Sequence, residues 1–316
     1  RMGQRITALR KLEGISQQEK GAHILDVNVG LPEIDEVSMM KKAIFEIQGI
    51  SDLPLQIDSS NPEVIEAGLR VCNGKAIVNS VNGEQAKLDA ILPIAKKYGV
   101  TRVSVNPQTL NEDVLKEIGR KHTVEQFYQA YALAKKSGFK DINVDLIAGL
   151  PYEDYASFAK SFDDAYGSSD MLQLGFLKLL YGTELRERAE EYEYRYLPTP
   201  PYTVLQSKWI KYGEMQRLTH IAEVLDRYLE SGRFAHALWY LTPLMPSPFG
   251  FWEGLSIYLE NHDTRPLQRI SQPDAFRYLL EYAKETVENV DVCKLKEMLA
   301  TDFSQHENKN PPTFLR

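Results

Sequence analysis

The chain has 316 residues, of which 43% are hydrophobic and 26% are charged, so it can bury one large core or two smaller ones. Its formal net charge of −7 argues against a general nucleic-acid binder, because such proteins usually carry a basic face. The cysteines, Cys72 and Cys293, form no CxxC pair, which excludes a disulfide framework and fits a reducing compartment. The sequence shows no signal peptide and no apolar run long enough to span a bilayer. We therefore expect a cytoplasmic protein that binds neither nucleic acid nor membranes.

Residues 1–20 have the pattern of a helix, a turn and the start of a second helix. Apolar residues recur at helical spacing up to Leu12, and Gly14 then predicts a stop. The segment resembles the opening of the helix-turn-helix domain of phage-repressor-like regulators, but the resemblance ends at Glu19, before any recognition helix. We expect a separate N-terminal helical segment, and a regulatory binding protein is one of the functions considered.

From residue 21 onward, apolar stretches rich in branched residues alternate with amphipathic stretches. The apolar stretches predict buried strands and the amphipathic ones helices, and this alternation implies a parallel sheet. Six such units predict an α/β fold, a partial TIM-type (βα)6 barrel over residues 21–182, rather than a closed eight-stranded barrel. The expected strands lie at 24–29, 55–57, 76–80, 102–105, 142–148 and 172–177, and the expected helices at 33–48, 62–71, 84–98 and 124–136.

Two of the expected strands end in the same way, with Gly and Pro followed by acidic residues. Gly30 and Pro32 follow the first strand, and Gly149 and Pro151 follow the fifth. Gly lets the chain turn tightly, Pro suits the first helical position, and acidic residues complement the positive end of a helix. The mouth where barrel enzymes build their sites is then expected to carry the polar residues at these strand ends, Asp26, Asn28 and Asp145.

Polar motifs close the first three expected strands. They are LDVNVG over 25–30, PLQIDSS over 54–60 and KAIVNSVNGE over 75–84. With these motifs, residues 21–99 resemble the pterin-binding barrel of methyltetrahydrofolate methyltransferases, which include cobalamin-dependent enzymes. The resemblance implies that Asp58 and Asn79 hydrogen-bond a pterin ring, with Asn28 beside them, since a carboxylate and an amide satisfy the mixed donors and acceptors of an aminopyrimidine. The alternative is that Asp58 and Ser59 cap the following helix.

The motifs after residue 100 belong to a different resemblance. They are NPQT over 106–109, IGRKHT over 118–123 and INVDLIAGLP over 142–151. They look like oxygen-independent coproporphyrinogen oxidases and related radical S-adenosylmethionine enzymes. The resemblance implies that Asn106, Arg120 and Asp145 line the groove for the nucleoside and amino-acid parts of S-adenosylmethionine. Because Arg120 follows Gly119, it is alternatively a solvated charge at a helix end.

From Glu153 onward the chain resembles the carboxyl-terminal half of uncharacterised cobalamin-associated radical S-adenosylmethionine proteins. The motifs include LQLGFLK over 172–178 and PSPF over 246–249. Residues 183–316 are expected to form an α-helical C-terminal region that packs on the barrel and closes its open side. Its expected helices lie at 185–194, 202–230, 235–241, 249–260, 273–287 and 292–299.

The cluster motif of the radical enzymes is missing. That family needs three cysteine thiolates in a CxxxCxxC loop after the first strand to hold a four-iron cluster. Here the loop after the first strand contains no cysteine, and Cys72 and Cys293 lie far apart in the sequence. We therefore expect no iron–sulfur cluster, and the sequence identifies no metal site and no catalytic residue.

Three functions remain open at this point. A catalytically empty barrel scaffold, recombined or designed from radical S-adenosylmethionine proteins, accounts for the abrupt changes of resemblance and the missing cysteines. A one-carbon or methyl-transfer enzyme accounts for the polar strand ends, which would bind tetrahydrofolate or S-adenosylmethionine as a small-molecule ligand. The regulatory binding protein is the third, and whether the chain is an enzyme is left undecided.

Overall fold

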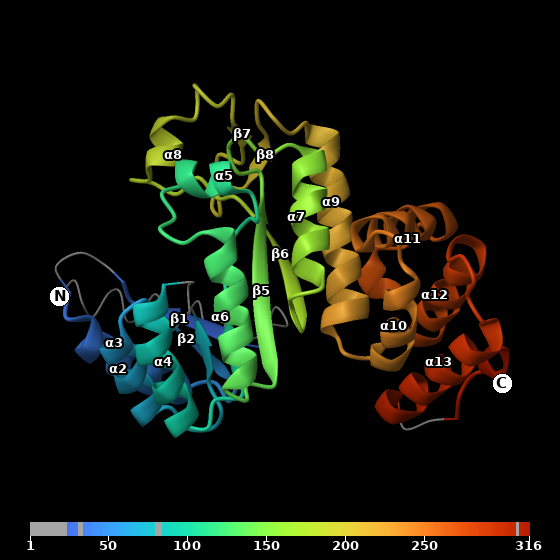
Figure 1. The fold of residues 1–316 in the computed structure, drawn as a ribbon, viewed down its shortest axis with the longest axis horizontal. Helices are drawn as coiled ribbons and strands as arrows, with labels where there is room; N and C mark the ends of the chain where they lie inside the picture. Colours follow the sequence, from blue (N-terminus) through green and yellow to red (C-terminus); the bar gives the residue numbers. More distant parts are fainter. Residues whose placement is uncertain (1–23, 31–33, 80–83, 308–309) are drawn as a thin grey trace. The chain divides into compact units, whose positions relative to one another are not determined.

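The computed structural model describes residues 24–30, 34–79, 84–307 and 310–316 (Figure 1). The predicted N-terminal segment, residues 1–20, lies outside the described residues. The chain splits into two compact units, each built from several stretches of sequence. Unit 1 comprises Arg1–Gln108, Gly119–Asp145 and Ser168–Asp170, and unit 2 comprises Thr109–Ile118, Leu146–Gly167 and Met171–Arg316. The division of the chain at residues 20 and 182 stays a prediction.

A six-stranded sheet with the strands in chain order forms a half-barrel, which confirms the predicted fold class. The pairs from the first to the fifth strand are parallel, as expected for strands that alternate with helices. The strands are β1 (Leu25–Asn28), β2 (Leu55–Asp58), β3 (Ile77–Asn79), β4 (Arg102–Ser104), β5 (Asp141–Ala148) and β6 (Met171–Phe176).

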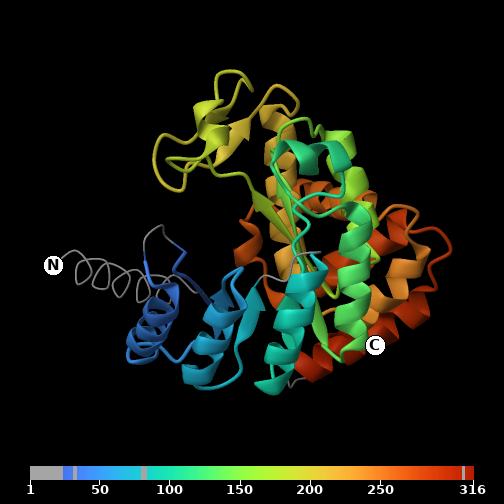
Figure 2. The same ribbon diagram turned by 60° about the vertical axis from the view of Figure 1, so that its left-hand side comes forward.

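Helices follow the strands of unit 1, and their starts have clear chemical causes. Asp35 caps the first helix, Asn61 the second, and Thr123 forms a capping box with Gln126. The second helix packs against the first and the third, and the first two lie side by side in both views (Figure 1, Figure 2). The helices are α2 (Glu36–Gln48), α3 (Pro62–Val71), α4 (Gln85–Lys97) and α6 (Val124–Lys136).

The sheet of unit 1 has one apolar and one polar face. Leu25 and Val27 of β1 are buried, whereas the alternate residues Asp26 and Asn28 are exposed. The same alternation continues on β2, because side chains point to opposite faces with a period of two. On the apolar side the packing is tight. A Cβ added at Gly68 of α3 would meet Ile57 and Met40 at 3.1 Å, so helix and strand approach closely there. The polar face is therefore the one left for a ligand.

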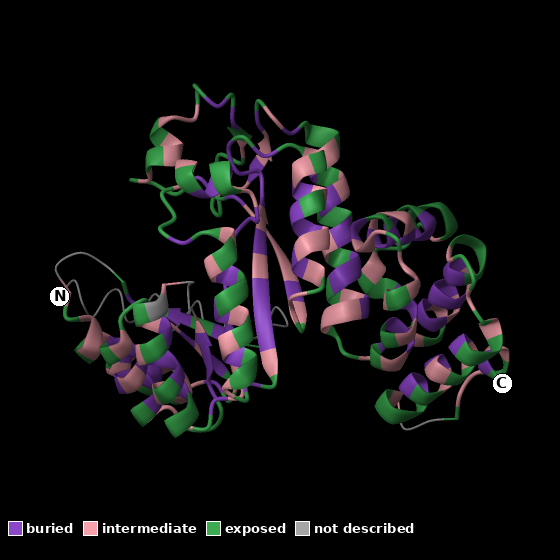
Figure 3. Ribbon diagram, viewed as in Figure 1, coloured by how far each residue is buried: buried purple, intermediate pink, exposed green. Residues whose placement is uncertain are grey.

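Unit 2 is mostly helical. Its aromatic core includes Trp252, which is fully buried, and Phe234, whose ring lies 4.3 Å from that of Phe276. Along its helices, buried segments alternate with exposed and intermediate ones (Figure 3). Its helices are α5 (Glu112–Glu117), α7 (Tyr155–Tyr166), α8 (Glu184–Glu187), α9 (Tyr212–Leu225), the π-helical η1 (Asp226–Glu230), α10 (Ala235–Leu241), α11 (Pro248–His262), α12 (Gln272–Thr286) and α13 (Val292–Glu307), with short 3-10 turns η2 (Thr242–Leu244), η3 (Leu267–Arg269) and η4 (Thr313–Leu315).

The all-helical prediction for residues 183–316 is wrong in one place. β7 (Arg195–Tyr196) and β8 (Val204–Gln206) form a separate antiparallel pair. The helix expected over 202–230 therefore begins only with α9 at Tyr212, and the helix expected over 185–194 is reduced to the short α8. The connection between β7 and β8 holds Pro198, Pro200 and Pro201, which lack the N–H that a helix needs and restrict the residue before them. Whether the helices close the open side of the barrel stays a prediction. Among the described residues, no helix has the length and apolar character needed to cross a membrane.

Candidate ligand-binding site

The carboxyl ends of three neighbouring strands bring Asn28, Asp58 and Asn79 into one row. Asn28 of β1 is in register with Asp58 of β2, and Asp58 is in register with Asn79 of β3. Because the strands are parallel, residues in register lie on the same edge of the sheet, where ligands bind in sheets of this kind. The structure thus brings together the residues that the first resemblance singled out.

Asn28 is held at both ends of its amide. Its Nδ2 donates to Asp58 Oδ2 at 2.8 Å, and its Oδ1 accepts from the Gly30 N–H at 2.9 Å. Burial raises the pKa of Asp58, and the hydrogen bond from Asn28 opposes that shift. The amide therefore orients the carboxylate and leaves it with lone pairs for further donors.

Asp58 does not cap the following helix, so that alternative is wrong. The N-cap of α3 is Asn61, whose Oδ1 accepts from the Glu63 N–H at 3.0 Å. Ser59 acts locally, since its Oγ accepts from the Asn61 N–H at 3.1 Å. Helix capping therefore does not account for Asp58.

Asn106 and Asp145 extend the row from the next strands. Asn106, just beyond β4, donates from Nδ2 to Asn79 Oδ1 at 2.9 Å. Burial raises the pKa of Asp145 on β5 to about 6, with a hydrogen bond from Asn106 lowering it and the Asp26 and Asp58 carboxylates raising it. The Oδ1 atoms of Asn106 and Asp145 are buried without a hydrogen-bond partner in the described structure. Such atoms are rare in proteins and suit a site that a ligand completes.

The residues at the strand ends that hydrogen-bond one another, Asn28, Asp58, Asn79, Asn106 and Asp145, are called the strand-end cluster. A further pair, Gln56 and Asp26, lies next to Asp58 on the same face of the sheet. Gln56 donates from Nε2 to Asp26 Oδ1 at 3.0 Å. The pKa of Asp26 is raised by burial and by the Asp58 carboxylate. Gln56 was not predicted as a site residue, although the period of two along β2 places it on the same face as Asp58.

Arg120 is not joined to the cluster. It is exposed and follows Gly119, which has a φ of +68° after the end of α5. Among the described residues, no hydrogen bond or ion pair links it to Asn106 or Asp145. Partial desolvation lowers its pKa, which does not require a partner. This placement agrees with the alternative of a charge at a helix end.

The chemistry of the cluster suits an organic ligand better than a metal. Its side chains are carboxylates and amides, which match a heterocycle rich in N–H donors. No group of three His, Cys, Asp or Glu residues that could hold a metal ion occurs in the described part of the chain. An iron–sulfur cluster does not fit either, because it needs several thiolates in one place. Cys72 lies at the end of α3, whereas Cys293 lies in α13.

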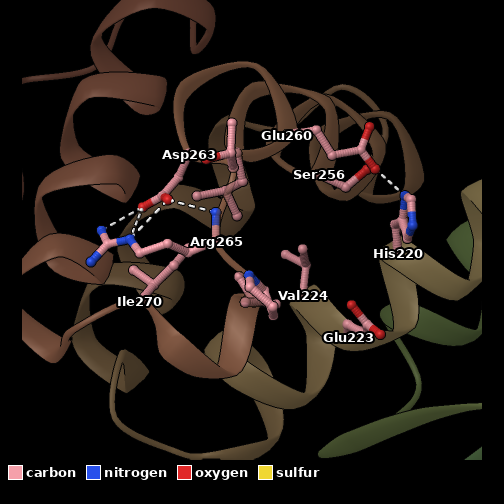
Figure 4. A pocket seen from close by; sticks show the side chains of 12 residues that line it. His220, Glu223, Val224, Ser256, Glu260, Asp263, Arg265 and Ile270 are labelled. Carbon is pink, nitrogen blue, oxygen red and sulfur yellow. Dashed lines mark hydrogen bonds and ion pairs between the residues drawn. The ribbon is translucent and has the colours of Figure 1, made fainter.

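Unit 2 contains a separate cavity of about 350 Å³ that no predicted site residue lines (Figure 4). It lies between α9, α11 and the loop that follows α11. His220 contacts Glu260 on one side, and Arg265 pairs with Asp263 at 2.5 Å on the other. Its charged groups are mostly paired with each other, so the cavity has a weaker claim to a ligand than the strand-end cluster.

Comparison with known proteins supports the two kinds of resemblance that the motifs predicted, although the pterin-binding match continues beyond residue 99, where that resemblance was expected to end. Residues 7–152 match the family described as pterin binding enzyme, and residues 190–316 match a family of unknown function, DUF4080. The oxygen-independent coproporphyrinogen-III oxidase-like protein HemZ of Bacillus subtilis (strain 168) is 37% identical over 91 residues, which cover 28% of this chain and 18% of the relative. A methylcorrinoid:tetrahydrofolate methyltransferase of Eubacterium limosum is 41% identical over 81 residues, 25% of this chain and 30% of that protein.

The chain therefore spans less than a third of the length of these two relatives. Among solved structures, coproporphyrinogen III oxidase (HemN) from Escherichia coli, a radical SAM enzyme, aligns with a TM-score of 0.32 and 22% identity over 55% of this chain and 36% of its own. Dihydropteroate synthase (FolP) from Thermus thermophilus aligns with a TM-score of 0.40 and 18% identity over 52% of this chain and 65% of its own. The chain is thus similar to pterin binding enzymes over residues 7–152 and to the DUF4080 family over residues 190–316, and one stretch of it is similar to a coproporphyrinogen-III oxidase-like protein.

Proposed function

We propose that the strand-end cluster binds the pterin ring of a folate and that the chain serves one-carbon or methyl transfer. The observation that carries the proposal is Asp58, a half-buried carboxylate held by Asn28, in register with Asn79, and not used as a helix cap. The match of residues 7–152 to pterin binding enzymes and the methyltransferase relative support the same ligand class.

Each group of the cluster has a chemical task in this proposal. Asp58 accepts from the amino group and a ring N–H of the pterin, and Asn79 adds a neutral amide. Asp145 is the group suited to hold or release a proton near neutral pH, because burial has raised its pKa to about 6. The folate supplies the one-carbon unit, and the acceptor of that unit is not identified by these residues.

S-adenosylmethionine is the competing ligand, since Asn106 and Asp145 are the positions that its family resemblance implies. A catalytically empty scaffold is the other competing prediction, and it requires that neither molecule binds. A titration with a folate distinguishes the pterin proposal from both competitors, because the cluster residues differ in their expected importance. Asp58 is central to pterin binding and lies outside the residues implied for S-adenosylmethionine.

Calorimetry of the full chain with methyltetrahydrofolate tests the proposal. Asp58→Asn keeps the shape of the side chain and removes its charge, so binding is expected to weaken roughly 10- to 150-fold, the cost of about 1.5 to 3 kcal/mol for a lost charged hydrogen bond. The matched control is Asp52→Asn, an exposed carboxylate just before β2, which is expected to leave affinity unchanged. No binding at millimolar ligand, or equal binding by Asp58→Asn, contradicts the proposal.

A further inference from the structure

The Asn106 amide stands between two groups of the strand-end cluster. Asn106 is only 8% exposed, and its Nδ2 donates to Asn79 Oδ1 at 2.9 Å. The same side chain hydrogen-bonds Asp145 and lowers the pKa of that carboxyl. An amide nitrogen has two hydrogens, so one NH2 group can serve both acceptors. Asn106 thereby connects the third strand with the fifth.

The orientation of this amide follows from its surroundings. Rotating it by half a turn would place Oδ1 against the Asp145 carboxyl, an oxygen against an oxygen, and would break both donations. Asn106 Oδ1 has no hydrogen-bond partner in the described structure, so no bond favours the rotated state. The Nδ2 group is therefore held toward Asn79 and Asp145.

This orientation fixes what Asn79 can offer. Because Asn79 Oδ1 accepts from Asn106, the end of the Asn79 amide left for a ligand is its NH2 group, a donor. Asp58 has the opposite character, since a carboxylate only accepts. The end of β2 thus presents an acceptor, the Asp58 carboxylate, and the end of β3 presents a donor, the Asn79 NH2 group.

We propose that Asn106 is a positioning residue that sets the hydrogen-bond polarity of the site, so that Asn79 donates to a ring nitrogen or carbonyl oxygen of the ligand. The identity of that ligand rests on the proposed function. The preferred class is a planar heterocycle with N–H donors facing Asp58 and an acceptor facing Asn79, as an aminopyrimidinone has. A ring with a donor at the second position would meet the Asn79 NH2 group and leave both donors unpaired, which is costly once the ligand excludes water from them.

The polarity can be measured without any ligand. In the unmutated full chain labelled with 15N-asparagine, the Asn106 side-chain NH2 signals are expected to follow the ionisation of Asp145, with a midpoint at about pH 6. The Asp26 and Asp58 carboxylates also raise the pKa of Asp145, so their 13C signals are followed in the same titration. Asn106 NH2 signals that stay constant through the Asp145 titration would overturn the proposal.

Two variants and a control separate positioning from general stability. In Asn106→Ala and Asn106→Asp the Asp145 midpoint is expected to rise, because the donor that lowers it is gone, and the Asn79 NH2 signals are expected to move toward those of a free amide. Asn143→Ala, which removes another buried asparagine with an unpaired Oδ1, is expected to leave the Asn79 signals in place. Equal responses in Asn106→Ala and Asn143→Ala would overturn the proposal.

Binding provides the final arm of the test. Asn106→Ala is expected to weaken methyltetrahydrofolate binding roughly 3- to 10-fold, since it loosens a neutral hydrogen bond rather than removing a charged one. Unchanged affinity in a variant whose Asn79 signals have moved would overturn the role in positioning. If the unmutated chain binds no folate, the proposed function fails, while the ligand-free titration still decides whether Asn106 bridges Asn79 and Asp145.

Discussion

At the level of single residues, burial changes the chemistry of carboxyl groups that look ordinary in the sequence. Glu153, which follows the turn after β5, is only 1% exposed in unit 2. Its Oε1 accepts from Thr109 Oγ1 at 2.5 Å and from Ser161 Oγ at 3.3 Å, while Oε2 is buried without a partner in the described structure. Burial raises its pKa to about 7, against the opposing hydrogen bonds. The sequence shows only an acidic residue after Gly and Pro.

We predict that Glu153 makes the stability of the chain fall as pH rises. Its folded pKa is about 7 and its ordinary value is 4.5, so between these values the folded state holds a proton that the unfolded state has lost. Its contribution to the free energy of unfolding is therefore fully present below about pH 4.5 and is lost as the pH rises to about 7. The total loss is up to ~3 kcal/mol. Urea unfolding at pH 5 and pH 8 measures this difference.

The matching variant is Glu153→Gln, which cannot ionise and is expected to lose most of that pH dependence. Glu288→Gln, at an exposed position of unit 2, is the control and is expected to keep it. An unchanged difference between the two pH values in Glu153→Gln would show that Glu153 is not the source.

At the level of helices and strands, α3 illustrates how much a local pattern can predict. The bounds predicted from the sequence, 62–71, agree with those observed, because Pro62 suits the first turn and Asn61 caps it. The prediction assigned a possible capping role to Asp58 and Ser59 instead. Choosing between nearby polar residues needs the backbone geometry, which places Asn61 Oδ1 at the Glu63 N–H.

We predict that Asn61→Ala lowers the free energy of unfolding by about 1 kcal/mol, because the Glu63 N–H loses its acceptor. Asn73→Ala is the matched control. Asn73 is exposed beyond the other end of α3, and its recorded hydrogen bonds to Gln48 run through its main chain. Denaturant unfolding of the two variants should separate them, and an equal loss would place the cap elsewhere.

The hairpin of β7 and β8 shows where local patterns mislead at the same level. Tyr192 and Tyr194 are both buried at a spacing of two, and Val204 is buried on β8. Burial at a spacing of two is typical of an extended chain. The residues before Tyr192 and after Val204 are nevertheless compatible with the helices that the sequence predicted. The three prolines between the strands would equally end a helix, so they do not by themselves distinguish a hairpin connection from a break between helices.

For the molecule as a whole, the thiols present do not support the iron–sulfur chemistry of the radical S-adenosylmethionine enzymes that the sequence resembles. We predict that anaerobic treatment with iron and sulfide leaves the chain without a four-iron cluster, because three thiolates are needed and only Cys72 and Cys293 exist. Iron analysis and the visible spectrum measure the outcome. The double variant Cys72→Ser with Cys293→Ser is expected to give the same result as the unmutated chain. The prediction is contradicted if the unmutated chain binds about four irons and the double variant binds none.

Local sequence patterns were sufficient to predict the order of the six strands of the sheet, the helices after the first three strands and the polar residues at the strand ends. These features depend on residue periodicity and on Gly and Pro, which act over a few neighbours. The folded structure was needed to show that Asn106 donates to Asn79, that Asp145 and Glu153 have raised pKa values, and that Arg120 is exposed. Those properties arise from burial and from contacts between residues far apart in the chain, and no local pattern specifies them.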